Sequence, residues 1–231
     1  MPKPIIAIDG PSGAGKSTLS KLLARELGLV NIDTGAMYRC VALAAARRGV
    51  DPEDEAALER LCGIIAIDFM RDGSGERVLL DGEDVSAAIR APEISLLTSK
   101  VAACPAVRRA LVRLQQELGR GGGVVLEGRD IGTVVFPGAD VKFFLSATAA
   151  ERGRRRFEEL RAKGLDVDLQ QTIAEVEARD AADSAREHAP LLQAADAIVI
   201  DSTAKPIETV LAEMLRAVRE QDSISPGKGG I

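Results

Sequence analysis

Residues 5–18 read Ile5-Ile6-Ala7-Ile8-Asp9-Gly10-Pro11-Ser12-Gly13-Ala14-Gly15-Lys16-Ser17-Thr18, and this stretch decides the fold. A short apolar run leads into a glycine-rich turn, and an amphipathic helical pattern follows the turn. Four positions between Gly10 and Ser17 match the spacing G-x-x-x-x-G-K-[ST] of a phosphate-binding loop. A strand-to-helix turn without a ligand is the alternative, but the flanking strand and helix favour a nucleotide site.

Each residue type in this turn suits phosphate binding. Glycines let backbone N–H groups point inward at a phosphate, which then lies at the positive end of the following helix. Lys16 adds a positive charge for the terminal phosphates, and the Ser17 hydroxyl is placed to bind magnesium. The sequence therefore predicts a site for a nucleotide and Mg²⁺.

Alternating strand and helix patterns predict a parallel α/β sheet. We expect a helix that Gly28 ends, then a strand over 29–32, a helix over 36–48, and later strands over 124–127, 141–145 and 197–200. An antiparallel hairpin over 65–70 and 77–80 interrupts this order, and we interpret it as an inserted subdomain. Pro92 and Pro105 are each predicted to lie in the first turn of a helix.

Composition excludes several classes of function. The 231 residues carry a formal net charge of −5, with 3% aromatic residues and no Trp, which argues against nucleic acid as a partner. Cys40, Cys62 and Cys104 are too widely spaced for a disulfide framework or a zinc site, so we expect free thiols in a reducing compartment. No apolar run is long enough to span a membrane. We therefore expect a cytoplasmic protein without a membrane partner.

Arginines are the second signal. They fall mostly at strand ends, helix starts and polar turns: Arg39, Arg108, Arg129, Arg152, Arg154, Arg155, Arg156, Arg179 and Arg186. Three consecutive arginines at 154–156 place positive charge around much of a helix, rather than interleaving it with acids at i+4. A solvated helix face is the alternative, but we interpret the cluster as a clamp for phosphate oxygens.

The chain contains one histidine, His188, in a polar loop, so the sequence offers no strong Ser/His or Cys/His nucleophile pair. Phosphoryl transfer needs no such pair, because positioning and charge neutralisation serve its loose transition state. An acceptor phosphate is already an ionised nucleophile. The absence of a general base therefore weakly favours a kinase with a nucleotide acceptor over one acting on a sugar hydroxyl.

Four motifs give the chain a resemblance to the bacterial cytidylate kinase family. They are residues 9–16, residues 33–39 (Asp-Thr-Gly-Ala-Met-Tyr-Arg), residues 128–137 (Gly-Arg-Asp-Ile-Gly-Thr-Val-Val-Phe-Pro), and Arg179-Asp180 with Asp183 and Arg186. The similarity covers residues 4–220 in order. It implies a parallel P-loop sheet flanked by helices over 1–35, 100–150 and 180–221, an antiparallel monophosphate-binding insert over about 36–99, and an arginine-rich lid over about 151–179. The proline and glycine content of residues 222–231 separately predicts a disordered tail.

The resemblance implies transfer of the γ-phosphate of ATP to CMP or dCMP. We expect the protein to be a monomer. The resemblance also implies that ATP and Mg²⁺ contact Gly10, Pro11, Ser12, Gly13, Ala14, Gly15, Lys16, Ser17 and Thr18, and that Arg152, Arg155 and Arg156 close over the donor. The implied acceptor pocket contains Thr34, Tyr38, Arg39, Ser99, Arg108, Arg129, Asp130, Arg179, Asp183 and Arg186. Within it, Arg39 and Arg129 bind phosphate, while Ser99, Arg108 and Asp130 read cytosine. Lys16, Arg129, Arg155 and Arg179 are the implied catalytic residues.

Two other interpretations stay open. A different P-loop kinase could phosphorylate UMP, AMP or a metabolite hydroxyl. The second interpretation is a nucleotide-dependent switch or a transport ATPase. The sequence has neither the N-K-x-D motif that reads guanine nor an L-S-G-G-Q signature, which argues against this interpretation. Rapid ATP hydrolysis without an acceptor would favour that second class.

Overall fold

The computed structural model describes residues 3–72 and 75–224, which divide into two compact units. The larger unit comprises residues 1–31 and 121–231, and the smaller unit comprises residues 32–120. The boundary differs from our expectation in two places: residues 32–35 and 100–120, which we assigned to the core, belong to the smaller unit.

The larger unit contains most of a five-stranded sheet with the order β2-β6-β1-β7-β8. Its elements are β1 (Ile5–Asp9), α1 (Lys16–Leu27), β6 (Val124–Glu127), a π-helical segment (Ile131–Val135), β7 (Val141–Ser146), α6 (Ala149–Ala162), α7 (Leu169–Ser184), β8 (Ile198–Asp201) and α8 (Ile207–Ile224), while β2 (Val30–Asp33) begins in this unit. β1 pairs in parallel with both β6 and β7, and β7 pairs in parallel with β8. The predicted parallel α/β sheet is therefore confirmed.

The core of the larger unit explains why these elements form. Ile6 and Ile8 of β1 pack with Phe143 of β7, with Leu19 and Leu23 of α1, and with the apolar stripe of α8, which includes Val210, Met214 and Val218. The stripe lets α8 bury one helical face, as its sequence period predicts. Since α1 and α8 cover β1, the loop between β1 and α1 is held at both ends by buried elements.

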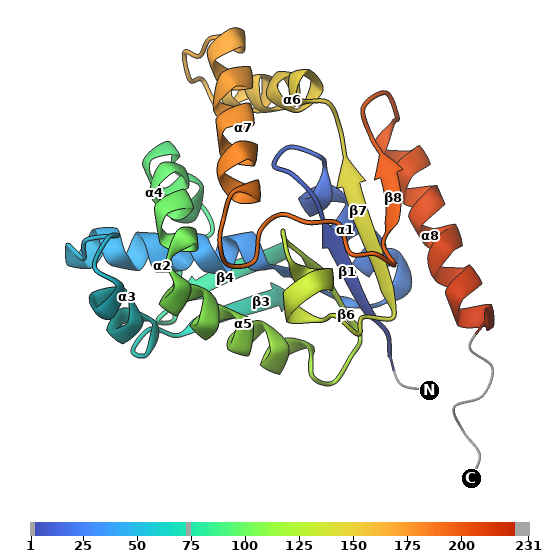
Figure 1. Cartoon of the computed structure of the whole chain (residues 1–231), viewed down its shortest axis with the longest axis horizontal. Helices are drawn as coiled ribbons and strands as arrows, with labels where there is room; N and C mark the ends of the chain where they lie inside the picture. The colour runs from blue at the N-terminus through green and yellow to red at the C-terminus, as the bar shows by residue number, and fades with distance from the viewer. Residues whose placement is uncertain (1–2, 73–74, 225–231) are drawn as a thin grey trace. The chain divides into compact units, whose positions relative to one another are not determined.

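The carboxyl ends of the parallel strands gather the polar segments of this unit. The glycine-rich loop follows β1, Gly128-Arg129-Asp130 follows β6, and α6 follows β7 (Figure 1). Ligands of open α/β sheets bind at this edge. The helices α6 and α7 pack side by side in both views, and a Cβ at Gly153 would lie 2.8 Å from the Ile173 Cα.

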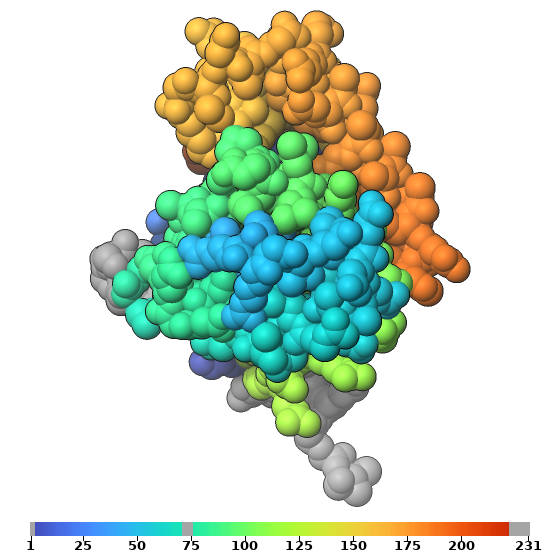
Figure 2. All heavy atoms as spheres, turned by 90° about the vertical axis from the view of Figure 1, so that its left-hand side faces the viewer, coloured from blue at the N-terminus to red at the C-terminus, as the bar shows by residue number. Residues whose placement is uncertain are grey.

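The smaller unit combines helices with a three-stranded antiparallel sheet, and its residues are coloured from light blue to green in Figure 2. Its elements are α2 (Thr34–Arg48), α3 (Glu55–Cys62), β3 (Ile67–Asp72), β4 (Gly75–Leu80), β5 (Glu83–Asp84), a 3₁₀ turn (Ala88–Arg90), α4 (Pro92–Ala103) and α5 (Pro105–Gly119). The two first-turn prolines are confirmed at the starts of α4 and α5. A third strand, β5, extends the predicted hairpin.

Three element boundaries differ from those predicted. α2 begins at Thr34 rather than residue 36, because the Asp33 carboxylate accepts a hydrogen bond from the Ala36 N–H and caps the helix. α7 continues to Ser184, past residue 179 where we expected the lid to end, so Asp183 lies on a helix. α8 continues to Ile224, although we expected the tail to begin at 222; the rest of the predicted tail lies outside the described residues.

Candidate active site

The loop over residues 10–17, called the phosphate loop below, has the backbone shape that anion binding requires. Gly10, Gly13 and Gly15 have φ angles of 143°, 78° and 95°, in the region that favours glycine. Gly15 caps α1 without any side-chain hydrogen bond, so the first N–H groups of that helix have no side-chain acceptor from their own cap. A phosphate placed there would accept hydrogen bonds from several N–H groups at once.

Lys16 is buried at the start of α1, and its Nζ donates a hydrogen bond to the Pro11 carbonyl at 2.7 Å. Burial, together with the nearby cations Arg129 and Arg179, lowers the pKa of Lys16 to about 7, against the opposing effect of Glu127 and Asp9. An anion beside this amine would favour its charged form. The loop is therefore electrostatically suited to a polyphosphate.

Glu127 is a functional candidate that the sequence analysis missed. It ends β6 with 5% of its surface exposed, and its Oε1 accepts a hydrogen bond from the Ser17 hydroxyl. The hydroxyl and the carboxylate are oxygen donors of the kind that Mg²⁺ prefers. A carboxylate directly after three apolar strand residues was the only usable signal in the sequence, because the neighbouring position of β6 and β1 is known only from the structure.

Asp9, like Glu127, was not assigned a functional role from the sequence. Its carboxylate accepts hydrogen bonds from the N–H groups of Ile131 and Gly132, at 2.8 and 2.7 Å, and so caps the π-helical segment. Burial raises the pKa of Asp9 to about 6, although the two N–H donors act in the opposite direction. The start of the phosphate loop is thereby tied to the segment that carries Arg129 and Asp130.

Asp183 brings two of the predicted acceptor arginines together. Its Oδ2 accepts from Arg129 Nε at 2.8 Å, and its other oxygen accepts from Arg186 Nη2. Burial opposes ionisation of Asp183, but the charges of Arg129 and Arg186 outweigh it and hold the pKa below the usual range. Arg179 also acts on this carboxylate. One acid therefore orients several cations of the site.

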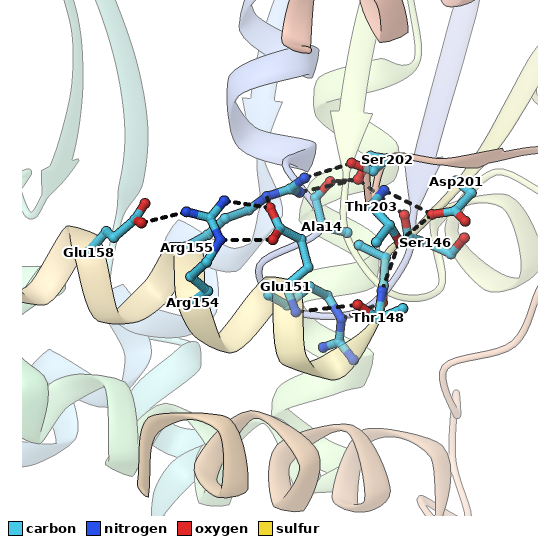
Figure 3. Close-up of polar contacts among 12 residues, drawn as sticks. Ala14, Ser146, Thr148, Glu151, Arg154, Arg155, Glu158, Asp201, Ser202 and Thr203 are labelled. Atoms are coloured by element: carbon cyan, nitrogen blue, oxygen red, sulfur yellow. Dashed lines mark hydrogen bonds and ion pairs between the residues drawn. The ribbon is translucent and has the colours of Figure 1, made fainter. Parts of the chain in front are cut away.

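The lid arginines correct one interpretation of the sequence. Arg154 pairs with Glu151 and Glu158, Arg155 pairs with Glu151, and Arg156 pairs with Glu159, so acids are interleaved with the arginine run after all. These pairs are drawn in part in Figure 3. Direct contact of Arg155 or Arg156 with a nucleotide would require exchange of these partners, and it stays a prediction.

Arg152 differs from the other lid arginines because its side chain is only 6% exposed. Its Nε donates to the Ala147 carbonyl at 2.8 Å and its Nη1 to the Ser12 carbonyl at 3.0 Å. Its Nη2 pairs with Asp180 of α7 at 2.5 Å. The guanidinium is thus directed at groups of the protein, including the phosphate loop.

The remaining predicted site residues belong to the smaller unit: Thr34, Tyr38, Arg39, Ser99 and Arg108. Arg108 is buried on α5, donates to the Ala102 carbonyl at 3.2 Å, and lies over the Tyr38 ring with its guanidinium carbon 5.5 Å from the ring centre. Tyr38 and Arg39 lie on α2, and Ser99 is half-buried on α4. Asp130, the third predicted base reader, is buried in the larger unit.

Other side chains agree with an active site without protein nucleophiles. His188 is exposed in a loop, as predicted. The three cysteines are free, and burial raises the pKa of Cys40 to about 12 and that of Cys62 to about 11, which suppresses thiolate formation. None of the helices among residues 3–72 and 75–224 is long and apolar enough to cross a bilayer.

The family profile that matches this chain and the similar proteins of known family all belong to one family. The family profile described as Cytidylate kinase matches residues 6–220. The chain is 64% identical to the cytidylate kinase of Syntrophotalea carbinolica over 98% of this chain and 97% of that protein. It is 59% identical to the cytidylate kinase of Geobacter sulfurreducens over 96% of each chain, and 48% identical to that of Vibrio cholerae over 94% and 97%.

Proposed function

This chain belongs to the cytidylate kinase family, and we propose that it transfers the γ-phosphoryl group of ATP to the 5′-phosphate of CMP and dCMP. The products are ADP and the corresponding diphosphate. The observation that carries the proposal is the setting of Lys16, a buried amine between an open helix N-terminus and further cations. That setting stabilises the charge of a polyphosphate and of its transfer.

On the donor side, the N–H groups of the phosphate loop and the amine of Lys16 bind the β- and γ-phosphates. Lys16 must leave the Pro11 carbonyl or share its donors with the nucleotide, because its Nζ carries three N–H groups. Arg155 and Arg156 are proposed to supply further positive charge from the lid.

On the acceptor side, the reacting phosphate needs cations rather than a base. An ionised oxygen of CMP forms the new bond to the γ-phosphorus while the bond from that phosphorus to the β,γ-bridging oxygen breaks, and ADP leaves with the electron pair. Arg129 and Arg39 are proposed to bind and orient the attacking phosphate. Arg179 and Asp183 are proposed to contact the sugar and phosphate.

The cytosine ring is proposed to be read by Ser99, Arg108 and Asp130. A cytosine edge offers one amino donor beside two acceptors, so a carboxylate and a cation suit it together. Arg108 lies over the Tyr38 ring and donates to the Ala102 carbonyl, so its guanidinium is held in a defined position on α5. Thr34 and Tyr38 are proposed to line the same pocket.

Magnesium fits the donor set at the start of α1. The hydroxyl of Ser17 and the carboxylate of Glu127 would hold it, directly or through water, and both are hard oxygen ligands. When bound, the ion neutralises charge on the ATP phosphates. Ser17 and Glu127 already contact each other, so little side-chain rearrangement is needed to present two oxygens at this place.

A coupled assay of ADP release with ATP and Mg²⁺ across CMP, dCMP, UMP, AMP and GMP tests the proposal. We expect CMP and dCMP to be used at least about tenfold better than AMP or GMP, because a pocket that pairs with a base edge discriminates strongly. Preference for AMP or GMP would reject the cytidine assignment, and rapid ADP release without an acceptor would indicate an ATPase. Light scattering on the same preparation tests the expectation of a monomer.

A further inference from the structure

Two side chains bind the phosphate loop from its outer side. Arg152 of α6 donates from Nη1 to the Ser12 carbonyl at 3.0 Å, and Ser202, just after β8, donates from Oγ to the Ala14 carbonyl at 3.0 Å. Both donors are buried, with 5% and 3% of their surfaces exposed. A buried donor aimed at a loop carbonyl is well placed to fix the orientation of that peptide group.

The orientation of the Ser12 and Ala14 carbonyls also sets the orientation of the N–H groups of the next residues, Gly13 and Gly15. In a planar trans peptide the C=O of one residue and the N–H of the next point in opposite directions, and the described residues contain no cis peptide bond. A Ser12 carbonyl held outward therefore directs the Gly13 N–H inward, and an outward Ala14 carbonyl does the same for the Gly15 N–H. Glycine allows a wide range of backbone angles, so without these hydrogen bonds the peptide groups before Gly13 and Gly15 could take other orientations.

The donors are themselves held in place. Arg152 is fixed by the Ala147 carbonyl and by Asp180, and a Cβ at Gly13 would lie 3.0 Å from the Arg152 Cβ, so the loop packs directly on this side chain. The Ser202 hydroxyl accepts from Arg155 Nη1 at 3.2 Å and also lies 3.1 Å from the Ser146 carbonyl. Figure 3 shows the chain of contacts from Arg155 through Ser202 to Ala14.

We propose that Arg152 and Ser202 are positioning residues, which hold two outer carbonyls of the phosphate loop so that the Gly13 and Gly15 N–H groups face the phosphates. For Arg152 this replaces the direct contact with ATP that the sequence suggested. The role rests on the proposed function only in naming ATP as the nucleotide. It makes the first turn of the lid helix α6 part of the polyphosphate site without any contact to the nucleotide.

The test measures binding of ADP and of tripolyphosphate by calorimetry to the full chain and to two variants, Ser202→Ala and Arg152→Gln. Each variant removes one outer donor, and we expect affinity for both ligands to fall about tenfold, because each loss frees one buried carbonyl. Thr203→Ala is the matched control for the hydroxyl, since Thr203 bonds Asp201 and the Thr148 N–H instead of the loop. Arg161→Gln is the control for the guanidinium, since Arg161 of the same helix lies over the Phe157 ring, with its guanidinium carbon 5.7 Å from the ring centre, instead of binding the loop. Both controls should bind as the unmodified chain does.

Each outcome decides the proposal. Losses confined to Ser202→Ala and Arg152→Gln support it, with the KM for CMP changed by less than about twofold. Loss in Arg152→Gln alone would indicate direct contact with the ligand and overturn it, as would equal losses in the controls. If Arg152→Gln fails to fold by circular dichroism, Ser202→Ala decides.

The binding test separates this inference from the proposed function. A chain that binds ADP tightly but does not phosphorylate CMP would refute the proposed acceptor and leave the two positioning roles measurable. Conversely, full CMP kinase activity with unchanged ADP binding in both variants would refute the positioning roles alone.

Discussion

Two buried lysines of the larger unit are held in different electrostatic surroundings. Lys16 and Lys142 are 5% and 7% exposed, and each donates from Nζ to the carbonyl of a proline five residues earlier, Pro11 or Pro137. Lys142 adds an ion pair with Asp196 at 2.8 Å, whereas Lys16 lies near the cations Arg129 and Arg179 as well as two acids. The fold neutralises the charge of Lys142 and leaves that of Lys16 to be neutralised by a ligand.

The largest expected effect separates catalysis from stability. Lys16→Met should lower kcat/KM for ATP about a thousandfold, because it removes a preorganised charge from the transferred phosphates. The melting temperature should stay equal or rise, because a desolvated amine near like charges is removed. Coupled kinetics and thermal unfolding measure the two quantities. A fall of less than tenfold in kcat/KM, or a clear loss of stability, would show that Lys16 has a structural role like that of Lys142.

Arg129→Ala should lower kcat/KM for CMP about a hundredfold, because a cation is taken from the attacking phosphate. The affinity for ATP should change far less. Titration calorimetry for ATP and steady-state kinetics for CMP measure the two effects separately. Equal losses for both nucleotides would place Arg129 on the donor instead, and Arg48→Ala serves as a control, because Arg48 forms an exposed pair with Asp81.

Protonation of Lys16 gives the next effect. With a pKa of about 7 the amine is mostly neutral at pH 8, and a bound polyphosphate favours the charged form, so ATP binding should take up about 0.9 proton at pH 8. The affinity for ATP should consequently fall as pH rises above 7, approaching tenfold per pH unit. Calorimetry in buffers of different ionisation heat measures the uptake.

Two variants sharpen this measurement. Arg129→Ala should reduce the proton uptake at pH 8, because Arg129 is a cation that lowers the pKa of Lys16. Lys142→Met should leave the uptake unchanged. No uptake in the unmodified chain would contradict the assigned setting of Lys16.

The smallest effect on activity is expected at Lys142. Lys142→Met should lower the free energy of unfolding by about 2 kcal/mol, because the Pro137 carbonyl loses a charged donor. Activity should stay within about threefold of the unmodified chain. Chemical denaturation and the coupled assay check the two expectations. A loss of activity larger than the loss expected from unfolding would mean that the segment before β7 takes part in catalysis.

Local signals carried most of what the sequence could predict. The phosphate loop, the capped helices and the first-turn prolines depend on residues within a few positions of one another. The pairing of the lid arginines was also local, since Glu151, Glu158 and Glu159 stand three or four residues from their partners, and the sequence analysis overlooked it.

Contacts between distant residues could not be read in this way. Glu127 meets Ser17 across 110 positions, and Ser202 meets Ala14 across 188. Such pairs arise because parallel strands bring their carboxyl ends to one edge, and the strand order β2-β6-β1-β7-β8 that decides which ends are neighbours is a property of the folded sheet. The division into two units likewise depends on which elements α5 packs against. The apolar periodicity of its sequence predicts a helix but does not identify those elements.

The absence of a side chain at Gly153 has a mechanical consequence. Because Gly153 of α6 lies against Ile173 of α7, the two helices approach so closely that there is no room between them for a methyl group. Alanine at this position would push the two helices apart and weaken the ion pair between Asp180 and Arg152.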